Sequence, residues 1–313
     1  MRRNLATVAA LVVTCAIAAA CGALDSPQPL ASPTATVVPR TPTATPVQGQ
    51  LLYAVGDIAD CASEGDEVVA ALLAASDAPI AALGDIVYEV ATTAEFANCF
   101  EPAWGPMKAR IRPAVGNHDY GRGQADDYYA YFGEAAGPPR LGYYSWDYAG
   151  WHVIVLNSVC DFVPGGCGVG SPQHQWLVAD LAAHPATCTL AYYHHPRFTS
   201  GLHGGIAAMD ALWQTLAAAG VDVALAAHDH HYERFVPLDA AGNRDEANGI
   251  RSFIVGTGGG TLFPVLAIHP NSVVRDTRTF GALELTLGKG AYAWRFLPAR
   301  GKTFTDAGSG KCH

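Results

Sequence analysis

Leu83-Gly84-Asp85-Ile86-Val87-Tyr88 places a carboxylate and a phenol three residues apart, directly after an apolar run. The run from Ala78 to Leu83 predicts a short buried strand. Gly84 allows a sharp turn, so we expect Asp85 to project from the end of this strand. The stretch therefore offers two ligands for a hard metal ion, Asp85 and Tyr88, from a single turn.

The same order of strand, glycine and polar residue occurs twice more in the first half of the chain. Residues 51–55 lead into Gly56-Asp57, and residues 111–115 lead into Gly116-Asn117-His118. Residues 64–75 carry apolar side chains at helical spacing, which predicts a βαβ unit between the first two strands. Because ligands of open α/β sheets gather at the carboxyl ends of the strands, we expect these polar residues to meet.

Two later predicted strands, 187–193 and 221–226, also end in polar residues. His194 follows the first of them, and His228-Asp229-His230 follows the second. Alternate residues of an extended chain point the same way, which pairs His228 with His230. The candidate metal ligands are Asp57, Asp85, Tyr88, Asn117, His194, His228 and His230. This mixture of donors suits Fe, Mn or Zn, and it exceeds what one tetrahedral ion needs, which favours two ions that share a carboxylate.

The remaining pattern predicts the fold class α/β. Residues 143–148 and 151–156 form a predicted hairpin, and residues 173–183 a helix that Ser171 caps. Helices are also predicted at 94–107, where Pro102 interrupts the pattern, and at 206–219, and strands at 250–255, 280–287 and 291–296. We expect two mixed sheets that pack face to face with helices outside, a four-layer α/β/β/α sandwich.

Composition predicts one folded domain that does not hold nucleic acid. The chain has 313 residues, of which 50% are hydrophobic, enough for one large core over residues 51–313. The formal net charge of −9 at pH 7 opposes binding to a polyanion.

The first 50 residues predict export. A charged start at Arg2-Arg3 and the apolar run 5–20 are typical of a signal peptide over residues 1–20. Ala18-Ala19-Ala20-Cys21 resembles a lipoprotein cleavage box, although an ordinary secretory signal with a stray cysteine remains the alternative. Residues 21–50 are rich in Pro and Thr and predict an extended tether. We expect an extracytoplasmic protein, secreted or held at the cell surface, that meets a membrane only through a lipid on Cys21.

Six cysteines remain once Cys15 and Cys21 are set aside with the leader, an even number that predicts disulfides in an exported protein. Six cysteines allow about fifteen pairings, and the sequence does not fix which one forms. Metal binding by thiolates is the weaker alternative, because no CxxC pair occurs. The pairing that we favour is Cys61 with Cys99, Cys160 with Cys167, and Cys188 with Cys312.

Five motifs in order resemble those of the calcineurin-like metallophosphoesterases, and Tyr88 with Tyr232-Glu233-Arg234 places the chain nearest the purple acid phosphatases. The motifs are Gly56-Asp57, Gly84-Asp85-Ile86-Val87-Tyr88, Gly116-Asn117-His118-Asp119, His194-His195-Pro196 and His228-Asp229-His230-His231-Tyr232-Glu233-Arg234. The resemblance covers about residues 51–234 and implies that 51–313 is the catalytic domain. It implies a first metal held by Asp57, Tyr88 and His230, and a second held by Asn117, His194 and His228. Asp85 would bridge the two ions.

The resemblance also implies a chemistry. Fe(III) would occupy the Tyr88 position, with Zn, Mn or Fe(II) at the second, and a metal-bound hydroxide would attack phosphorus in line. His118 and His203 would face the phosphoryl group or the leaving oxygen, and Asp119 would orient His118. The implied protein is a binuclear hydrolase of small phosphate monoesters. The alternatives are a phosphodiesterase on the same site and a surface phosphate-binding protein without catalysis.

Overall fold

The computed structural model describes residues 46–121 and 123–313. Residues 1–45, which include the predicted signal peptide, Cys21 and most of the predicted tether, lie outside the described residues. Within the described part, no helix combines the length and the apolar character needed to cross a membrane.

The first sheet has the strand order β13-β12-β11-β1-β2-β3. Its strands are β1 (Gly49–Val55), β2 (Ile80–Leu83), β3 (Ile111–Ala114), β11 (Gly281–Gly288), β12 (Ala291–Pro298) and β13 (Ala307–Lys311). β1, β2 and β3 run parallel, with Tyr53 opposite Ile80 and Ile80 opposite Ile111. This register aligns the carboxyl ends of three strands, each of which is followed by one of the predicted ligands.

The second sheet has the strand order β10-β8-β9-β7-β6-β5-β4. Its strands are β4 (Tyr144–Tyr148), β5 (Trp151–Val155), β6 (Thr189–Tyr192), β7 (Val223–Ala226), β8 (Tyr232–Leu238), β9 (Ile250–Val255) and β10 (Ser272–Asp276). The predicted hairpin is confirmed as β4 and β5, which pair antiparallel. β5, β6, β7 and β9 run parallel, so β6 and β7 also present their carboxyl ends together.

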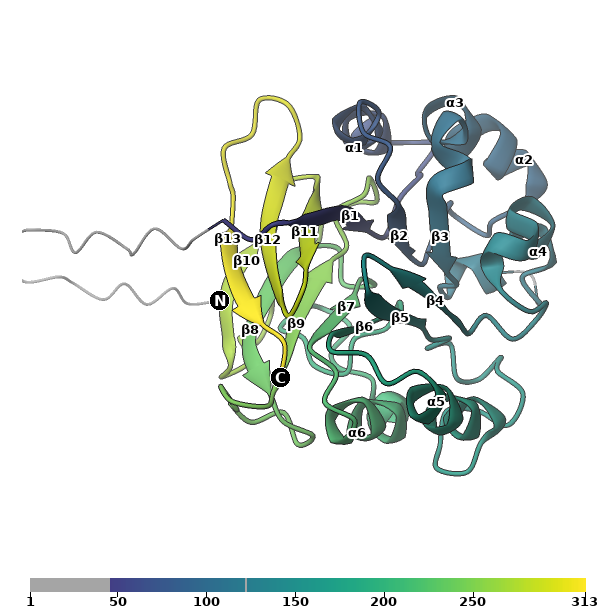
Figure 1. Ribbon diagram of the computed structural model, residues 1–313. Coiled ribbons are helices and arrows are strands. Elements are labelled where there is room, and N and C mark those ends of the chain that lie inside the picture. Colours follow the sequence, from purple (N-terminus) through teal and green to yellow (C-terminus); the bar gives the residue numbers. More distant parts are fainter. Residues whose placement is uncertain (1–45, 122) are drawn as a thin grey trace, which may run out of the picture. The chain divides into compact units, whose positions relative to one another are not determined.

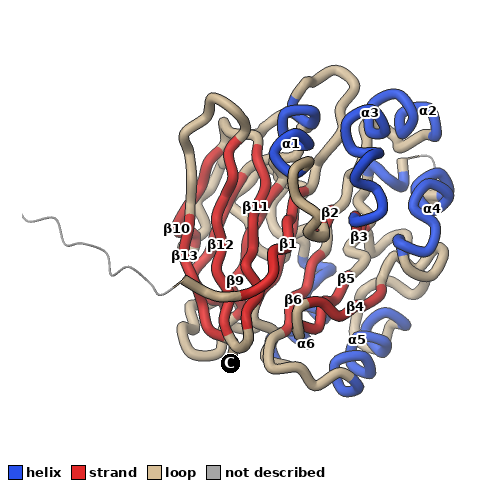
Figure 2. The backbone as a smooth tube through the Cα atoms, turned by 45° about the horizontal axis from the view of Figure 1, so that its top comes forward, coloured by secondary structure: helices blue, strands red, loops and turns tan. Residues whose placement is uncertain are grey.

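Helices cover the outer faces of both sheets (Figure 1). On the side of the first sheet lie α1 (Gly65–Leu73), α2 (Thr93–Glu95), α3 (Glu101–Trp104) and α4 (Asp126–Phe132). On the side of the second lie α5 (Pro172–Ala183) and α6 (Asp210–Ala218). Figure 2 shows the strands of both sheets between these two groups of helices. The predicted four-layer α/β/β/α sandwich is confirmed.

The two sheets meet in a shared core. Leu52 and Leu283 of the first sheet pack in one buried cluster with Tyr192, Leu225 and Phe253 of the second. Separate clusters lie between each sheet and its helices. Because strands such as β2 and β7 are buried along their whole length, they are apolar at every position rather than alternating.

Some boundaries differ from the sequence predictions. The helical segment after β2 is continuous through Pro102, because a π-helical turn (Phe96–Phe100) ends there and Pro102 occupies the first turn of α3, where proline is tolerated. The helix predicted from residue 206 begins as a 3₁₀ turn (Ala207–Met209). Strands β8, β10 and β13 were not predicted, since polar and glycine residues interrupt their apolar patterns.

The three predicted disulfides are confirmed. Cys61 pairs with Cys99, Cys160 with Cys167, and Cys188 with Cys312. The last bond closes a loop of 124 residues and joins the start of β6 to the end of the chain. Bonds of this kind are typical of proteins that fold in an oxidising compartment.

Candidate metal centre

A cavity of about 470 Å³ opens where the loops after β2, β3 and β7 converge. Its lining residues are Asp60, Asp85, Tyr88, Glu89, Asn117, His118, His203, His228, His230, Gly260, Thr261 and Phe263. Asp57 and His194 lie beneath it, fully buried. The structure therefore brings all seven predicted ligands to one place.

The first group of donors consists of Asp57, Tyr88 and His230. The Tyr88 hydroxyl lies 3.0 Å from Asp57 Oδ1 and 3.1 Å from His230 Nε2. His230 Nδ1 lies 2.7 Å from the carbonyl oxygen of Thr261, which can only accept a hydrogen bond, so Nδ1 carries the proton. The lone pair of Nε2 therefore faces the two oxygens, as in a histidine oriented to bind a metal.

The second group consists of Asp85, Asn117 and His194. His194 Nε2 lies 3.1 Å from Asp85 Oδ2 and 3.0 Å from Asn117 Oδ1. The other ring nitrogen, Nδ1, donates to the carbonyl oxygen of Leu83, 2.9 Å away. As at His230, a backbone carbonyl fixes the ring and directs Nε2 at oxygen atoms.

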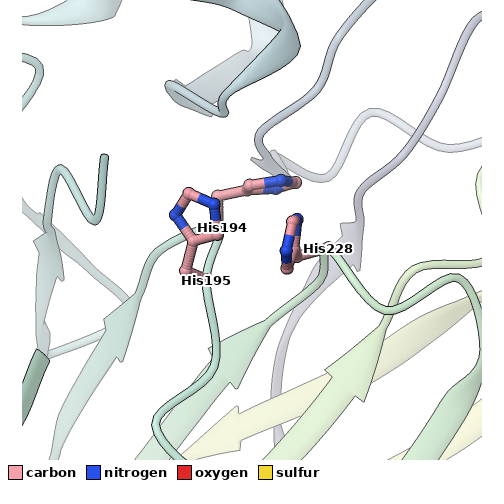
Figure 3. Close-up of side chains that lie close together, drawn as sticks. All are labelled: His194, His195 and His228. Atoms are coloured by element: carbon pink, nitrogen blue, oxygen red, sulfur yellow. The ribbon is translucent and has the colours of Figure 1, made fainter. Parts of the chain in front are cut away.

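The imidazole of His228 completes this group. Figure 3 shows His194, His195 and His228 with their rings close together, and the centroid of the His228 ring lies 5.0 Å from that of His194. His195 lies behind them, where its Nδ1 contacts the carbonyl oxygen of Ser158 at 3.1 Å. Because Ser158 holds His195 while His194 meets Asp85 and Asn117, the geometry favours His194 as the ligand of the pair.

A buried carboxylate oxygen without a hydrogen-bond partner makes this site suitable for cations. Asp57 Oδ2 is buried without a hydrogen-bond partner in the described residues. Burial raises the pKa of Asp57, and it raises that of Tyr88 well above its ordinary value, with Asp57 adding to the effect. Burial alone would lower the pKa of His194, but Asp85 and Asp57 raise it to about 9, so a proton supplies positive charge there when nothing else does. The donor set and its charge fit two cations.

Three of the proposed ligands have a strained backbone. Asp57, Asp85 and His228 have φ values of 56°, 49° and 68°. A left-handed backbone is uncommon for residues other than glycine, and such residues concentrate at functional sites. At Asp57 and Asp85 the turn after the strand therefore extends beyond the glycine to the ligand itself.

His118 lies at the mouth of the cavity, but Asp119 does not orient its ring as the resemblance implied. His118 Nδ1 contacts the carbonyl oxygen of Glu89 at 2.7 Å. The carboxylate of Asp119 is buried and accepts hydrogen bonds from the backbone N–H groups of Gly116 and Ile86, at 2.7 and 3.1 Å. Asp119 therefore links the two loops that carry Asp85 and Asn117. The carbonyl oxygen of Glu89, rather than Asp119, orients the ring of His118.

His203 also lines the cavity, with its ring 4.5 Å from that of His228, and it has a carboxylate partner that the sequence analysis missed. Asp229 is fully buried and its Oδ1 lies 3.1 Å from His203 Nδ1. The hydroxyl of Thr199 donates to the other oxygen, Oδ2, at 2.7 Å. Asp229 stands between His228 and His230, in a segment that lies between β7 and β8 and is not the extended chain expected from the sequence, because φ of His228 is 68°.

The cavity also has walls from a segment without a recognised motif. Gly260 N donates to the carbonyl oxygen of Asp57 at 3.0 Å, and a Cβ at Gly260 would lie 3.0 Å from the His230 ring. The ring of Phe263 stacks on that of His230, with centroids 4.5 Å apart. The glycine-rich run 256–260 could have indicated close backbone approach, but nothing in the sequence linked Phe263 to the site.

Fold and site together define a metallophosphoesterase. The chain belongs to the calcineurin-like phosphoesterase family, whose sequence profile matches residues 51–232. Probable purple acid phosphatase 20 of Arabidopsis thaliana is 29% identical over 167 residues, which cover 45% of this chain and 38% of that protein. Purple acid phosphatase 22 of the same organism is 35% identical over 123 residues, 37% of this chain and 27% of that protein.

A solved structure supports the fold. The purple acid phosphatase PPD1 from yellow lupin (Lupinus luteus) seeds superposes with a TM-score of 0.69 at 17% identity, over 84% of this chain and 54% of that one. The chain thus spans between about a quarter and a little over half the length of these three proteins.

Proposed function

We propose that residues 51–313 form the catalytic domain of a binuclear metal-dependent hydrolase of phosphate monoesters. The observation that carries the proposal is the sorting of the donors into two groups that meet at Asp85, since ligand atoms of Asp57, Asp85 and His194 all lie within 4.8 Å of one another. Asp57, Tyr88 and His230 would hold one ion, and Asn117, His194 and His228 the other. The similarity of the chain to purple acid phosphatases supports a phosphatase reaction.

The donor chemistry favours Fe(III) beside Tyr88. Burial holds the phenol protonated without a cation, so a strong Lewis acid is needed to convert it to tyrosinate. The second position, with an amide oxygen and two imidazoles, suits Zn, Mn or Fe(II). Two bound cations would supply charge neutralisation of the phosphate and activation of water.

The chain's own residues would position the ester and move a proton. A phosphate in the cavity would lie near His118 and His203, which both line it, the first with its ring 4.6 Å from that of Tyr88 and the second with its ring 4.5 Å from that of His228. Each ring is held at Nδ1, by Glu89 O and by Asp229, so Nε2 is the nitrogen available to donate a proton to the leaving oxygen. Phe263 covers His230 and limits the access of water to that side.

The direct experiment is turnover by metal-loaded protein of p-nitrophenyl phosphate and bis(p-nitrophenyl) phosphate, measured on one preparation. We expect the monoester to have the higher kcat/KM. Faster cleavage of the diester would make the protein a phosphodiesterase on the same site. Binding of inorganic phosphate without turnover of either ester would indicate a phosphate-binding protein instead.

Metal identity has a spectroscopic test. Iron-loaded protein should show a broad visible absorption band from a ferric-tyrosinate pair, and the Tyr88→Phe variant should lose it. Tyr120→Phe is a matched control, because the Tyr120 hydroxyl is bound by Asn157 rather than by the site. A band that persists without Tyr88 would exclude tyrosinate at this position.

We also propose export by residues 1–20 and lipidation of Cys21. The three disulfides support an oxidising destination. Mass spectrometry of the mature N-terminus from the native cell would find either a diacylated Cys21 or an unmodified residue near position 21. The unmodified form would indicate an ordinary secretory signal.

A further inference from the structure

An apolar loop lies directly beside the mouth of the cavity. Residues 262–268 read Leu-Phe-Pro-Val-Leu-Ala-Ile and form neither helix nor strand. All seven side chains are at least partly exposed, with Leu266 66% and Ile268 61% accessible. Runs of exposed apolar residues are uncommon on soluble proteins and mark sites of interaction.

The loop is held in place by buried polar contacts. The backbone N–H of Leu266 donates a hydrogen bond to the carbonyl oxygen of Ser200 at 3.2 Å, and the backbone N–H of His269 donates one to the Ser200 hydroxyl at 2.9 Å. Ser200 in turn donates to the fully buried Glu233, from its backbone N–H at 2.9 Å and its hydroxyl at 2.5 Å. The exposed apolar side chains are therefore presented by an anchored backbone.

A further exposed apolar residue, Leu202, stands two positions after Ser200. Leu202 is 44% accessible and directly precedes His203, which lines the cavity. At the other end of the apolar loop, Phe263 lines the cavity and stacks on His230. Phe263 thus lines the cavity, and the exposed side chains of Leu202, Leu266 and Ile268 belong to the two segments that Ser200 joins beside it.

We infer that this surface binds the leaving group of the substrate, and that the preferred substrates are phosphate monoesters of long aliphatic alcohols. The inference rests on the proposed function and specifies its substrate class. One amphiphilic molecule accounts for both features, because its phosphate fits the cavity and its chain covers the adjoining loop. A protein docked on the same surface would instead lie over the cavity mouth and obstruct it.

The test uses n-alkyl phosphates from ethyl to octyl, each below the concentration at which it forms micelles. Complete burial of a methylene group corresponds to about a fourfold gain in kcat/KM, and half burial on an open loop to about twofold. Six added methylenes should therefore raise kcat/KM by roughly 50-fold from ethyl to octyl phosphate. The ratio of the two values is the readout, because it cancels effects common to both substrates.

The double substitution Leu266→Ser and Ile268→Ser should reduce this ratio at least about tenfold. Val169→Ser is the matched control, since Val169 is also exposed (82%) but lies in the loop before α5. Its ratio should equal that of the unmodified protein. An equal loss in the control would overturn the assignment of the effect to the loop.

A second readout does not depend on turnover. Calorimetric titration with octylphosphonate should show tighter binding and a more negative heat-capacity change than with ethylphosphonate, and the double variant should lose the difference. A flat alkyl series with measurable turnover of ethyl phosphate would overturn the inference and leave the proposed function standing. Absence of turnover for every ester, with chain-length-dependent phosphonate binding retained, would overturn the proposed function and support the loop as an apolar binding surface.

Discussion

Asp57→Asn should stabilise the metal-free protein and reduce the further stabilisation that added metal gives. The carboxylate of Asp57 is fully buried, and its Oδ2 has no hydrogen-bond partner among the described residues. Asparagine has the same shape and can still accept from the Tyr88 hydroxyl, which lies 3.0 Å from Oδ1. The substitution removes a buried carboxyl group whose pKa is raised by burial and whose Oδ2 has no partner.

The expected size follows from the cost of such a group. An unsatisfied buried polar atom costs about 1–3 kcal/mol, and the amide retains part of that cost, so we expect a gain of about 1–2 kcal/mol in the unfolding free energy. For a domain of this size the melting temperature should rise by about 2–6 °C. A metal at 100 times its Kd adds about 2.7 kcal/mol to the unmodified protein, and most of this should be lost in the variant.

The assay is thermal unfolding with a chelator and with added Zn²⁺. Asp306→Asn is the matched control, because Asp306 is a buried carboxylate with its donors in place: Arg234, Tyr232 and Trp294. The Asp306→Asn variant should have an unfolding free energy about 3–5 kcal/mol lower than that of the unmodified protein, with or without metal. If Asp57→Asn behaved like this control and kept the full metal response, Asp57 would not be a ligand.

Three further predictions concern other parts of the molecule. Burial and then Glu67 raise the pKa of Asp66 from 3.8 to about 7, so its contribution to stability is present below about pH 4 and is lost as the pH rises through 7. Urea unfolding at pH 5 and pH 8 should therefore show a smaller difference in Asp66→Asn, and an unchanged difference would contradict the shift. Replacing Cys188 and Cys312 by serine should lower the unfolding free energy by about 2–5 kcal/mol, because their bond closes a loop of 124 residues; an unaffected urea midpoint would refute this. Asp229→Asn should lower kcat by about 100-fold with little change in KM, because His203 loses the partner that orients it; a change in KM alone would indicate a binding role.

The sequence located the proposed ligands because each depends on local chemistry. An apolar strand, a glycine and a polar residue together form a unit of a few residues, and the parallel order of β1, β2 and β3 follows from the helices that connect them. The order of predicted strands and helices indicated the two-sheet architecture, whereas the disulfide pairing was a preference among about fifteen that the sequence does not decide. The sequence analysis did not find β8, whose apolar pattern is interrupted by Glu233 and Arg234, or β13, whose alternate glycines carry no apolar signal.

The orientation of the proposed acid–base residues could not be predicted. The resemblance implied that Asp119 orients the ring of His118. The N–H groups of Gly116 and Ile86 bind its carboxylate instead, and the ring turns to the carbonyl of Glu89. Such choices depend on competition among several donors, which only the packed structure resolves.

By itself, the sequence determined which side chains stand at strand ends and hence which chemistry the chain can perform. Tertiary structure alone decided how those side chains are grouped: Tyr88 meets His230 across 142 residues, and His194 meets Asn117 across 77. It also decided that residues 262–268 lie beside the cavity. The physical reason is that the position of a residue along a strand sets the direction of its side chain, whereas the distance between segments is set by the packing of the two sheets against each other.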